Sequence, residues 1–346
     1  MTMTMTAPRR LDAPVPAPAP GALVDGFGRV HRDMRVSVTD RCSLRCTYCM
    51  SAEGVPLMPA RDLLTDAEIV RAVAVATRLG VDRVRLTGGE PLVRPGLVGI
   101  VAGIVGLPSA PEVSLTTNGI GLAELAEPLA QAGLSRVNIS IDSLDPVHYA
   151  TLARRDRLAQ ALAGVAAARD AGLTPVKINT VVMPGINEDD VLPLVDFALA
   201  GGFELRFIEQ MPLDSGHLWR RDLMITAPDI LDLIRTKHRL TQLDDTDAPA
   251  QRWLVDDGPG AVGVIAAVTR PFCARCDRVR LTADGQLRNC LFSNAESDLR
   301  SAMRSGASDD QLAQIFRACV SAKRAQHGIG QPGFVPPARP MSAIGG

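Results

Sequence analysis

Three cysteines within eight residues constrain this chain more than any other feature. Cys42, Cys46 and Cys49 are separated by three and then two residues, so their thiolates can turn toward one point. Thiolates favour soft metals, and four-cysteine sites suit zinc or iron–sulfur clusters. A fourth local ligand is missing here, so a 4Fe–4S cluster on these thiols would keep one iron open for chemistry. The alternatives are a zinc site with a distant ligand and three unrelated buried cysteines.

A second set of cysteines comprises Cys273, Cys276 and, fourteen residues later, Cys290. A lone C-x-x-C pair is ambiguous between zinc, a redox pair and chance, and a third thiol favours a metal. The lack of an obvious fourth ligand argues against a closed structural zinc site. The spacing therefore favours a second iron–sulfur cluster with an open iron and leaves zinc as the alternative. The seventh cysteine, Cys319, lies in an apolar helical context.

The N-terminal segment and the composition argue against several classes of protein. Residues 1–30 carry Met-Thr repeats and a Pro/Ala run without an apolar signal core, which predicts a disordered tail and a cytoplasmic protein. No run of about 20 apolar residues follows, so we expect no membrane span. A net charge of −1 and 3% aromatic residues argue against nucleic-acid binding. In a reducing compartment, cysteines indicate metal ligands or free thiols rather than disulfides.

Extended runs alternate with helical segments over residues 34–208. The helix expected over 65–79 begins with the capping box Thr65-x-x-Glu68 and ends before Gly80, and another runs over 188–200 before a Gly-Gly pair. Strand–helix alternation at this spacing predicts an α/β fold with a parallel sheet, either open or barrel-like. The expected strands are 34–39, 83–87, 113–116, 136–141, 176–182 and 204–208.

Five of these strands carry polar residues at every second position. Parallel strands covered on both faces read as nearly continuous apolar runs, whereas Arg85 and Thr87 alternate with Val84 and Leu86. Period two places each polar set on one face of its strand. The pattern predicts a barrel with a polar, ligand-holding interior, and a sheet with one hydrated face is the alternative. The other polar sets are Ser114 and Thr116; Asn138, Ser140 and Asp142; Lys177 and Asn179; and Glu204 and Arg206.

The pattern changes after Met211. A helix is expected over 226–238, with Thr226 as its N-cap and Pro228 in its first turn. An acidic loop around 244–247 follows. We predict that residues 226–326 form a smaller lobe that closes the mouth of a barrel made by residues 31–225, with residues 327–346 as a separate C-terminal tail. The lobe's expected strands are 261–268 and 278–282, and its further helices are 294–304 and 308–326.

A turn at the end of the second strand, Gly88-Gly89-Glu90-Pro91, has the composition of a ligand contact. Paired glycines let the backbone approach a ligand closely, and Glu90 can accept hydrogen bonds from an ammonium group. Active sites gather at this end of a barrel. The motif fits neither a Rossmann fingerprint nor a P-loop.

Basic residues also gather around the second cysteine set. Arg278 and Arg280 are two apart in an expected strand, so both guanidinium groups lie on one face and suit bidentate phosphate binding. A solvated basic strand is the alternative. Inward-facing Arg35, Arg85 and Lys177 favour the phosphate interpretation, because buried like charges need anions, and a triphosphate would supply them. Lysines are rare, and the chain's three are Lys177, Lys237 and Lys323.

Together these residues resemble the radical S-adenosylmethionine (radical-SAM) GTP 3′,8-cyclases, the molybdenum cofactor biosynthesis protein A family. The resemblance covers about residues 35–346 and includes both cysteine sets, the Gly-Gly-Glu-Pro turn and the terminal Gly345-Gly346. Segments 115–119 and 176–180 match as well. It implies a partial (β/α)6 radical-SAM barrel. The implied enzyme is a lyase that converts GTP to (8S)-3′,8-cyclo-7,8-dihydroguanosine 5′-triphosphate, the first step of molybdenum cofactor biosynthesis.

The resemblance also implies roles for individual positions. Two 4Fe–4S clusters are implied, one on Cys42, Cys46 and Cys49 and the other on Cys273, Cys276 and Cys290. S-adenosylmethionine binding is implied for Tyr48, Gly89, Ser140 and Met211, and Glu90 is expected to join them. GTP binding is implied for Arg35, Arg85, Thr116, Lys177, Arg278, Val279 and Arg280. Arg278, Arg280, Gly345 and Gly346 are expected to take part in catalysis, with the tail inserted beside GTP.

The expected partners are GTP, a low-potential electron donor of the flavodoxin or ferredoxin type, and the next enzyme, cyclic pyranopterin monophosphate synthase. A homodimer is a further expectation. Two rival functions share parts of the pattern. Another radical-SAM enzyme with an auxiliary cluster, such as a peptide modifier, would need more auxiliary cysteines and no phosphate-binding arginines. A non-enzymatic zinc or iron–sulfur sensor is the rival from another class, and zinc without iron in anaerobically purified protein would support it.

Overall fold

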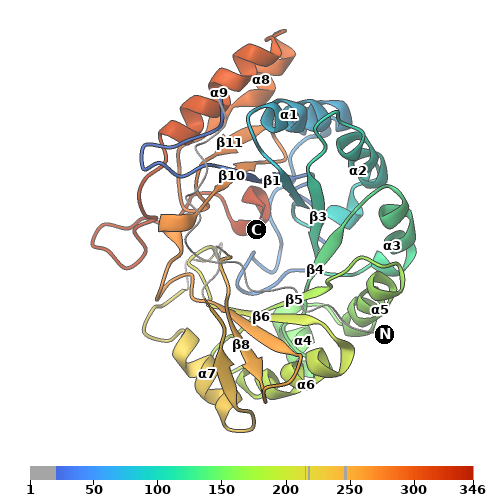
Figure 1. The fold of residues 1–346 in the computed structure, drawn as a ribbon, viewed down its shortest axis with the longest axis vertical. Coiled ribbons are helices and arrows are strands. Elements are labelled where there is room, and N and C mark those ends of the chain that lie inside the picture. The colour runs from blue at the N-terminus through green and yellow to red at the C-terminus, as the bar shows by residue number, and fades with distance from the viewer. Residues whose placement is uncertain (1–20, 215, 217–218, 245–247, 346) are drawn as a thin grey trace, which may run out of the picture.

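The six expected strands stand side by side, in chain order, in one curved parallel sheet with helices along its outer side (Figure 1). The computed structural model describes residues 21–214, 216, 219–244 and 248–345. Each strand matches its predicted range to within two residues, so the prediction of a parallel α/β fold is confirmed. They are β1 (Asp33–Ser37), β2 (Arg83–Thr87), β3 (Glu112–Thr117), β4 (Arg136–Ser140), β5 (Lys177–Val181) and β6 (Glu204–Ile208).

The C-terminal third of the chain extends this sheet at both edges. β10 (Arg278–Leu281) pairs in parallel with β1, and β9 (Ala261–Ile265) pairs in parallel with β6. The strands expected at these two places are therefore confirmed. Four short strands that the sequence did not predict continue the sheet outward: β11 (Gln286–Arg288) and β12 (Ser297–Asp298) beyond β10, and β8 (Gln251–Val255) and β7 (Leu240–Gln242) beyond β9. The expected C-terminal lobe thus shares the barrel's sheet, because the open edges of a partial barrel offer unpaired backbone groups.

Local capping rules account for where three of the predicted helices begin, whereas the helices expected from 188 and 294 begin later, at Val191 and Leu299. Thr65 accepts a hydrogen bond from the Glu68 amide while the Glu68 side chain accepts one from Thr65, and Gly80 follows with φ +92°. Thr226 and Asp229 form the same box. The helices are α1 (Asp66–Arg78), α2 (Leu97–Val105), α3 (Leu122–Gln131), α4 (Pro146–Ala153), α5 (Leu158–Asp170), α6 (Val191–Gly201), α7 (Ala227–Arg235), α8 (Leu299–Arg304), α9 (Asp309–Ser321) and the four-residue α10 (Met341–Ile344).

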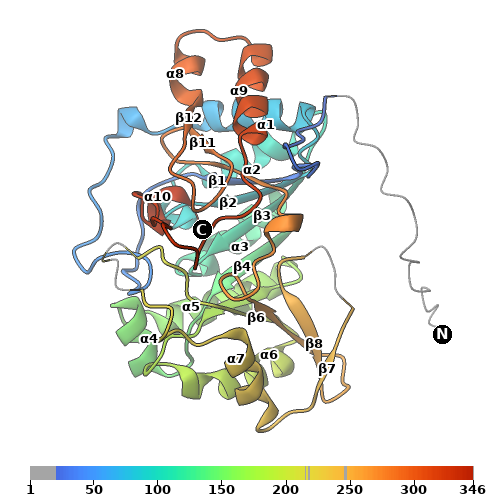
Figure 2. The ribbon, with the colours of Figure 1, turned by 90° about the vertical axis from the view of Figure 1, so that its left-hand side faces the viewer.

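The helices and the outward-facing strand residues share one continuous apolar core. α8 and α9 stand beside α1 at one end of the molecule (Figure 2), where Arg71 contacts Asp309 at 2.9 Å and Arg304 contacts Glu68 at 2.7 Å. Within the described residues, no helix has the length and apolar character needed to cross a membrane. The acidic loop expected at 244–247 lies mostly outside the described residues, and Asp244 itself is in irregular backbone.

Candidate active site

The inner face of the sheet surrounds a cavity of about 1340 Å³. Small-molecule sites usually occupy about 300–1,000 Å³, so this cavity has room for more than one ligand. Its wall includes polar residues from all five strands with period-two patterns, which confirms the predicted polar barrel interior. They are Arg85, Thr87, Ser114, Thr116, Asn138, Ser140, Asp142, Lys177, Asn179 and Arg206.

The first cysteine set lies on the loop after β1, and all three of its thiols line the cavity. The loop is anchored to the end of α4, where the amides of Arg45 and Thr47 donate to the carbonyls of Ala153 and Leu152 at 3.0 and 2.9 Å. Burial raises the pKa of the Cys49 thiol to about 12. Burial, Asp142 and the neighbouring thiolates also raise the pKa of Cys46. Buried thiolates of this kind need a cationic partner, which an iron–sulfur cluster provides.

The two glycines of the Gly-Gly-Glu-Pro turn lie directly against the first cysteine loop. A Cβ atom on Gly89 would stand 2.3 Å from the Arg41 carbonyl oxygen, and one on Gly88 would stand 2.6 Å from that of Thr39. The amide of Gly89 donates to the Thr39 carbonyl at 2.8 Å. The sequence predicted that the two glycines let the backbone approach a ligand closely. In the structure they let the turn pack closely against the loop that carries the first three thiols.

Glu90 lines the cavity, but it is only 1% exposed and its carboxylate is bonded within the chain. It accepts from the Thr117 hydroxyl at 2.6 Å, the Asn118 amide at 2.7 Å and the Leu92 amide at 3.0 Å. Burial nevertheless raises the pKa of Glu90 to about 7. Glu90 therefore fixes the ends of β2 and β3 together, and its contact with an ammonium group stays a prediction.

Tyr48, Ser140 and Met211 also line the cavity, and Tyr48 belongs to the loop of the first cysteine set. The Tyr48 hydroxyl donates to Asp142 Oδ2 at 2.6 Å. Burial raises the pKa of Asp142 to about 6. Asp142 belonged to the predicted polar face of its strand but was not assigned a role, because period two shows which face a residue takes and not what it contacts.

The second cysteine set faces the same cavity from the strands added beside β1. Cys273 and Cys276 lie just before β10, and Cys290 lies just after β11. Burial and the neighbouring thiolates raise the pKa of Cys273. For Cys276, burial acts in the same direction, but Lys323 and Arg278 outweigh it and lower the pKa of this thiol. Cys319 is buried in α9, as expected of a core residue.

Both sets suit 4Fe–4S clusters. Within each set the thiolates are close enough to act on one another's pKa. Among the described residues, no three His, Cys, Asp or Glu side chains converge tightly enough to hold a single metal ion. A 4Fe–4S cluster is larger than an ion and takes its thiolates on different irons, so a wider spacing of the sulfur atoms is what it requires.

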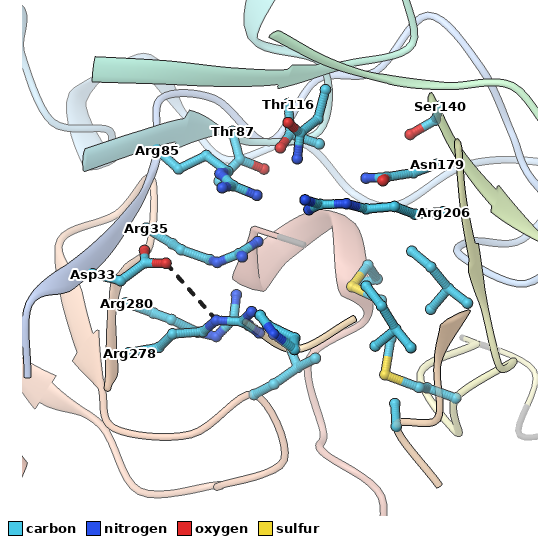
Figure 3. Close-up of a pocket in the computed structure, with 18 of the residues that line it drawn as sticks. Asp33, Arg35, Arg85, Thr87, Thr116, Ser140, Asn179, Arg206, Arg278 and Arg280 are labelled. Carbon is cyan, nitrogen blue, oxygen red and sulfur yellow. Dashed lines mark ion pairs between the residues drawn. The ribbon is translucent and has the colours of Figure 1, made fainter. Parts of the chain in front are cut away.

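Three arginines form a row across neighbouring strands. The sheet register pairs Arg35 of β1 with Arg280 of β10 on one side and with Arg85 of β2 on the other. Figure 3 shows these side chains, with Arg278, reaching into one space that Arg206 enters from the facing side. Burial lowers the pKa of Arg85 and of Arg280 to about 10, and it lowers that of Arg35 as well, with adjacent arginines adding to the effect.

Carboxylates compensate only part of this charge. Asp33 lies 3.9 Å from Arg278, and Glu204 lies 2.8 Å from Lys177 and 3.1 Å from Arg206. In the described part of the chain, basic side chains lining the cavity outnumber acidic ones. The basic set is Arg29, Arg32, Arg35, Arg83, Arg85, Arg136, Lys177, Arg206, Arg275, Arg278 and Arg280, and the acidic set is Asp33, Glu90, Asp142 and Asp277.

Several buried polar atoms in the cavity wall have no hydrogen-bond partner among the described residues. They include Thr116 Oγ1, Asn138 Oδ1, Asn179 Oδ1 and Arg35 Nε. Leaving a buried polar atom unpaired costs about 1–3 kcal/mol. These atoms and the excess positive charge both indicate a polar, anionic ligand.

The structure brings together nearly all of the predicted site residues, with two qualifications. The Val279 side chain lies in the core, on the opposite face of β10 from Arg278 and Arg280, so only its backbone can meet a ligand. Arg288, one of the basic residues near the second cysteine set, is 1% exposed and pairs with Glu296 instead of lining the cavity.

The chain's C-terminal segment enters the space enclosed by the strands (Figure 1). The Arg280 guanidinium donates to the Gly345 carbonyl. Gly345 has φ +84°, and a Cβ atom there would stand 3.1 Å from both Ser37 and Thr87 side-chain carbons. Gly346 lies outside the described residues. Arg29, Arg136, Arg206 and His327 also line the cavity, although the sequence did not single them out as site residues.

Comparison with known families divides the chain into two matched regions. The Radical SAM superfamily model matches residues 36–198, and the model described as Molybdenum Cofactor Synthesis C matches residues 203–329. Among solved structures, SuiB from Streptococcus suis bound to S-adenosylmethionine is similar in fold, with a TM-score of 0.57 at 14% identity over 84% of this chain and 69% of SuiB.

Curated relatives are similar over nearly their whole length. A GTP 3′,8-cyclase of Streptomyces coelicolor is 57% identical over 328 residues, which cover 94% of this chain and 96% of the relative. GTP 3′,8-cyclase 2 of Mycobacterium tuberculosis is 54% identical over 336 residues, which cover 95% of this chain and 93% of the relative.

Proposed function

This chain belongs to the GTP 3′,8-cyclase family, and we propose how its cavity carries out that family's reaction. The enzyme is a radical-SAM lyase of molybdenum cofactor biosynthesis that carries two 4Fe–4S clusters. It converts GTP to (8S)-3′,8-cyclo-7,8-dihydroguanosine 5′-triphosphate. The assignment of individual residues to GTP, S-adenosylmethionine and the clusters is our proposal.

The row of buried arginines is the observation on which the GTP site rests. Arg280, Arg35 and Arg85 are neighbours in the sheet, with burial lowering the pKa of each. A triphosphate carries several negative charges and many acceptor oxygens, so it would compensate these cations and engage their guanidinium groups in charge-assisted hydrogen bonds. Arg278, Arg206 and Lys177 stand around the same space and would complete the phosphate site.

We assign the side of the cavity next to Cys42, Cys46 and Cys49 to S-adenosylmethionine. When bound, the first cluster and S-adenosylmethionine supply the radical chemistry that removes a hydrogen atom from GTP. Gly89, Ser140 and Met211 shape this side, and Tyr48 is held in place by Asp142. The chain's task is to orient both ligands so that the reacting atoms are adjacent.

Cys273, Cys276 and Cys290 would hold the second cluster at the guanine end of GTP, with Arg278 and Arg280 between that cluster and the phosphates. Thr116, Asn138 and Asn179 offer their unpaired polar atoms to the ligands across the cavity. The tail would cover GTP from the open side, since Gly345 already contacts Arg280 and crowds β1 and β2. Covering the site excludes water and other groups that would quench a radical.

We further expect the reaction to run in the cytoplasm with a flavodoxin- or ferredoxin-type electron donor. The product would pass to cyclic pyranopterin monophosphate synthase. A homodimer stays a prediction that size analysis of the purified enzyme would test.

The proposal is tested by anaerobic incubation of the reconstituted enzyme with S-adenosylmethionine, dithionite and GTP, with 5′-deoxyadenosine and the cyclised nucleotide measured separately. Replacing Arg85 with Met should weaken GTP binding at least tenfold while the iron content is unchanged. Arg169→Met serves as the matched control, because Arg169 is exposed and pairs with Asp170 at the end of α5. Unchanged GTP affinity in Arg85→Met would contradict the phosphate site.

A further inference from the structure

A buried lysine lies beside the second cysteine set. Lys323 follows α9 and is 5% exposed. Its ammonium group donates to Cys276 Sγ at 3.3 Å, to the Cys276 carbonyl at 3.1 Å and to the Arg278 carbonyl at 2.9 Å. An ammonium group has three N–H donors, so all of them are directed at residues 276–278. None of these acceptors is a carboxylate.

The positive charge of Lys323 therefore has to be balanced by an anion other than a carboxylate in direct contact. The contacts of its ammonium group in the described chain are two backbone carbonyls and the Cys276 sulfur. A buried ammonium without an anion is costly. The anion that suits this position is the thiolate set of the second cluster.

The two cysteine sets differ in the charges around them. Near the first set, the cavity wall carries the carboxyl groups of Glu90 and Asp142, and Arg45 donates to the Cys42 carbonyl at 2.8 Å. Near the second set, the Lys323 ammonium group donates to the Cys276 sulfur at 3.3 Å, and Arg278 follows two residues later at the start of β10. A lysine ammonium group therefore touches a ligand sulfur of the second set directly.

Lys323 is held in position by the segment before β1. Arg29 donates to the carbonyls of Arg324 and Ala325 on one side and to the Cys273 carbonyl on the other. His31 Nδ1 lies 3.3 Å from the same Arg278 carbonyl that accepts from Lys323. These contacts fix the lysine and the C-x-x-C loop relative to each other.

We propose that Lys323 positions Cys276 and raises the reduction potential of the second cluster. This inference rests on the proposed function in one respect, the presence of that cluster. On reduction one electron enters the cluster from the external donor, and no bond or proton is exchanged. A fixed positive charge that also donates a hydrogen bond to a ligand sulfur stabilises the added negative charge, which is a known way for a protein to tune a cluster.

The test uses a chain in which Cys42, Cys46 and Cys49 are all alanine, so that only the second cluster is observed. An anaerobic redox titration followed by electron paramagnetic resonance compares this parent with Lys323→Met. We expect the reduction equilibrium to shift about tenfold toward the oxidised form, which is about 59 mV for one electron. Lys323→Gln keeps an N–H donor without the charge and should give a smaller shift.

Lys237→Met is the matched control, because Lys237 pairs with Asp196 at 2.6 Å on the outer surface and touches neither cysteine set. The reduction potential of the second cluster in Lys237→Met should equal that in the parent. Iron and sulfide in the parent are measured first, since a parent without a second cluster refutes the cluster assignment itself. A parent with the cluster and unchanged potentials in the Lys323 variants overturns only the role of Lys323. If Lys323→Met does not fold, Lys323→Gln decides in the same titration.

Discussion

His31 lies in a buried polar cluster next to β10. Its Nε2 atom is 3.1 Å from Asp25 Oδ2. Burial and the charge of Lys323 lower the pKa of His31 to about 4, although Asp25 and the Arg278 carbonyl act in the opposite direction. The ring is therefore neutral in the folded protein near pH 7. The cluster joins the N-terminal segment to the loop that carries the second cysteine set, so the ionisation of one side chain is linked to the stability of this region.

The lowered pKa predicts a stability that falls with acid. In the unfolded chain a histidine takes a proton near pH 6.5, but folded His31 does so only near pH 4. Between these values the unfolded state binds more protons. The free energy of unfolding should therefore fall by up to about 1.4 kcal/mol per pH unit as the pH drops below 6.5.

Denaturant titrations between pH 7.5 and 5.5 would measure this slope, and His31→Gln should flatten it. His148→Gln is the control, because His148 is only partly buried and its pKa is raised, rather than lowered, by its hydrogen bond to Asp190. An equally steep slope in His31→Gln and in the wild-type chain would show that another group is responsible.

Gly345 provides a second test at the scale of one residue. Its φ of +84° makes any side chain strained, and a Cβ atom would crowd Ser37 and Thr87 at 3.1 Å. Gly345→Ala should displace the tail and reduce the cyclised product at least tenfold, while iron content and 5′-deoxyadenosine formation change little. Deletion of Gly345 and Gly346 should have the same effect.

Gly333→Ala is a closely matched control for Gly345→Ala. Gly333 has nearly the same φ, +81°, but nothing lies within 4 Å of the added Cβ atom. It imposes the backbone strain without the crowding. Normal product formation in both variants would mean that the tail does not shape the site.

At the scale of elements, Glu209 joins three segments at the end of β6. It is fully buried, and its carboxylate accepts from the amides of Ala227, Val268 and Thr269, each at 2.9 Å, and from the Thr269 hydroxyl. These donors belong to the first turn of α7 and to the loop that leads from β9 toward Cys273. One side chain thus sets where the C-terminal strands and the second cysteine set attach to the barrel.

Removing the Glu209 carboxylate should therefore destabilise the protein strongly. Glu209→Ala leaves several buried donors without an acceptor, each costing about 1–3 kcal/mol, so we expect a loss of about 3 kcal/mol or more in the free energy of unfolding. Glu209→Gln retains one acceptor oxygen and should lose less. Exposed Glu127→Ala, which gives up a single bond to Gln131, is the control. Equal stability of Glu209→Ala and this control would contradict the role given to Glu209.

At the scale of the whole molecule, the sheet, which has twelve strands within the described residues, places two cysteine sets around one cavity. The first belongs to the loop after β1, and the second is carried by strands that add to the edge of β1. In the proposed assignment the two sets would bind metal separately, because their ligands come from different loops. The cavity between them is where GTP and S-adenosylmethionine would meet.

Iron analysis tests this arrangement. Anaerobically purified and reconstituted protein should contain about eight irons per chain, as two 4Fe–4S clusters require. Cys46→Ala and Cys276→Ala should each retain about four and give different spectra. Loss of all iron from either variant would mean that the two sites are not independent, and zinc in place of iron would refute the cluster assignment.

The sequence alone determined the parts of this protein that depend on local physics. Period-two polarity indicated the inner face of each strand, because side chains alternate across a strand wherever it lies. Thr65 with Glu68 and Thr226 marked helix starts, because a cap satisfies amides within the same turn. The two cysteine sets were evident from their spacing. The family resemblance then supplied the reaction and the site residues.

Only the tertiary structure decided which distant residues became neighbours. The row Arg280–Arg35–Arg85 joins strands far apart in the chain, and its register has no local signal. Lys323 is an ordinary residue after a helix until folding buries its ammonium group against Cys276. The pairing of β10 with β1 and of β9 with β6 likewise joins segments that are far apart in the chain. Pairing, burial and charge compensation depend on neighbours brought together by folding, and local sequence does not specify them.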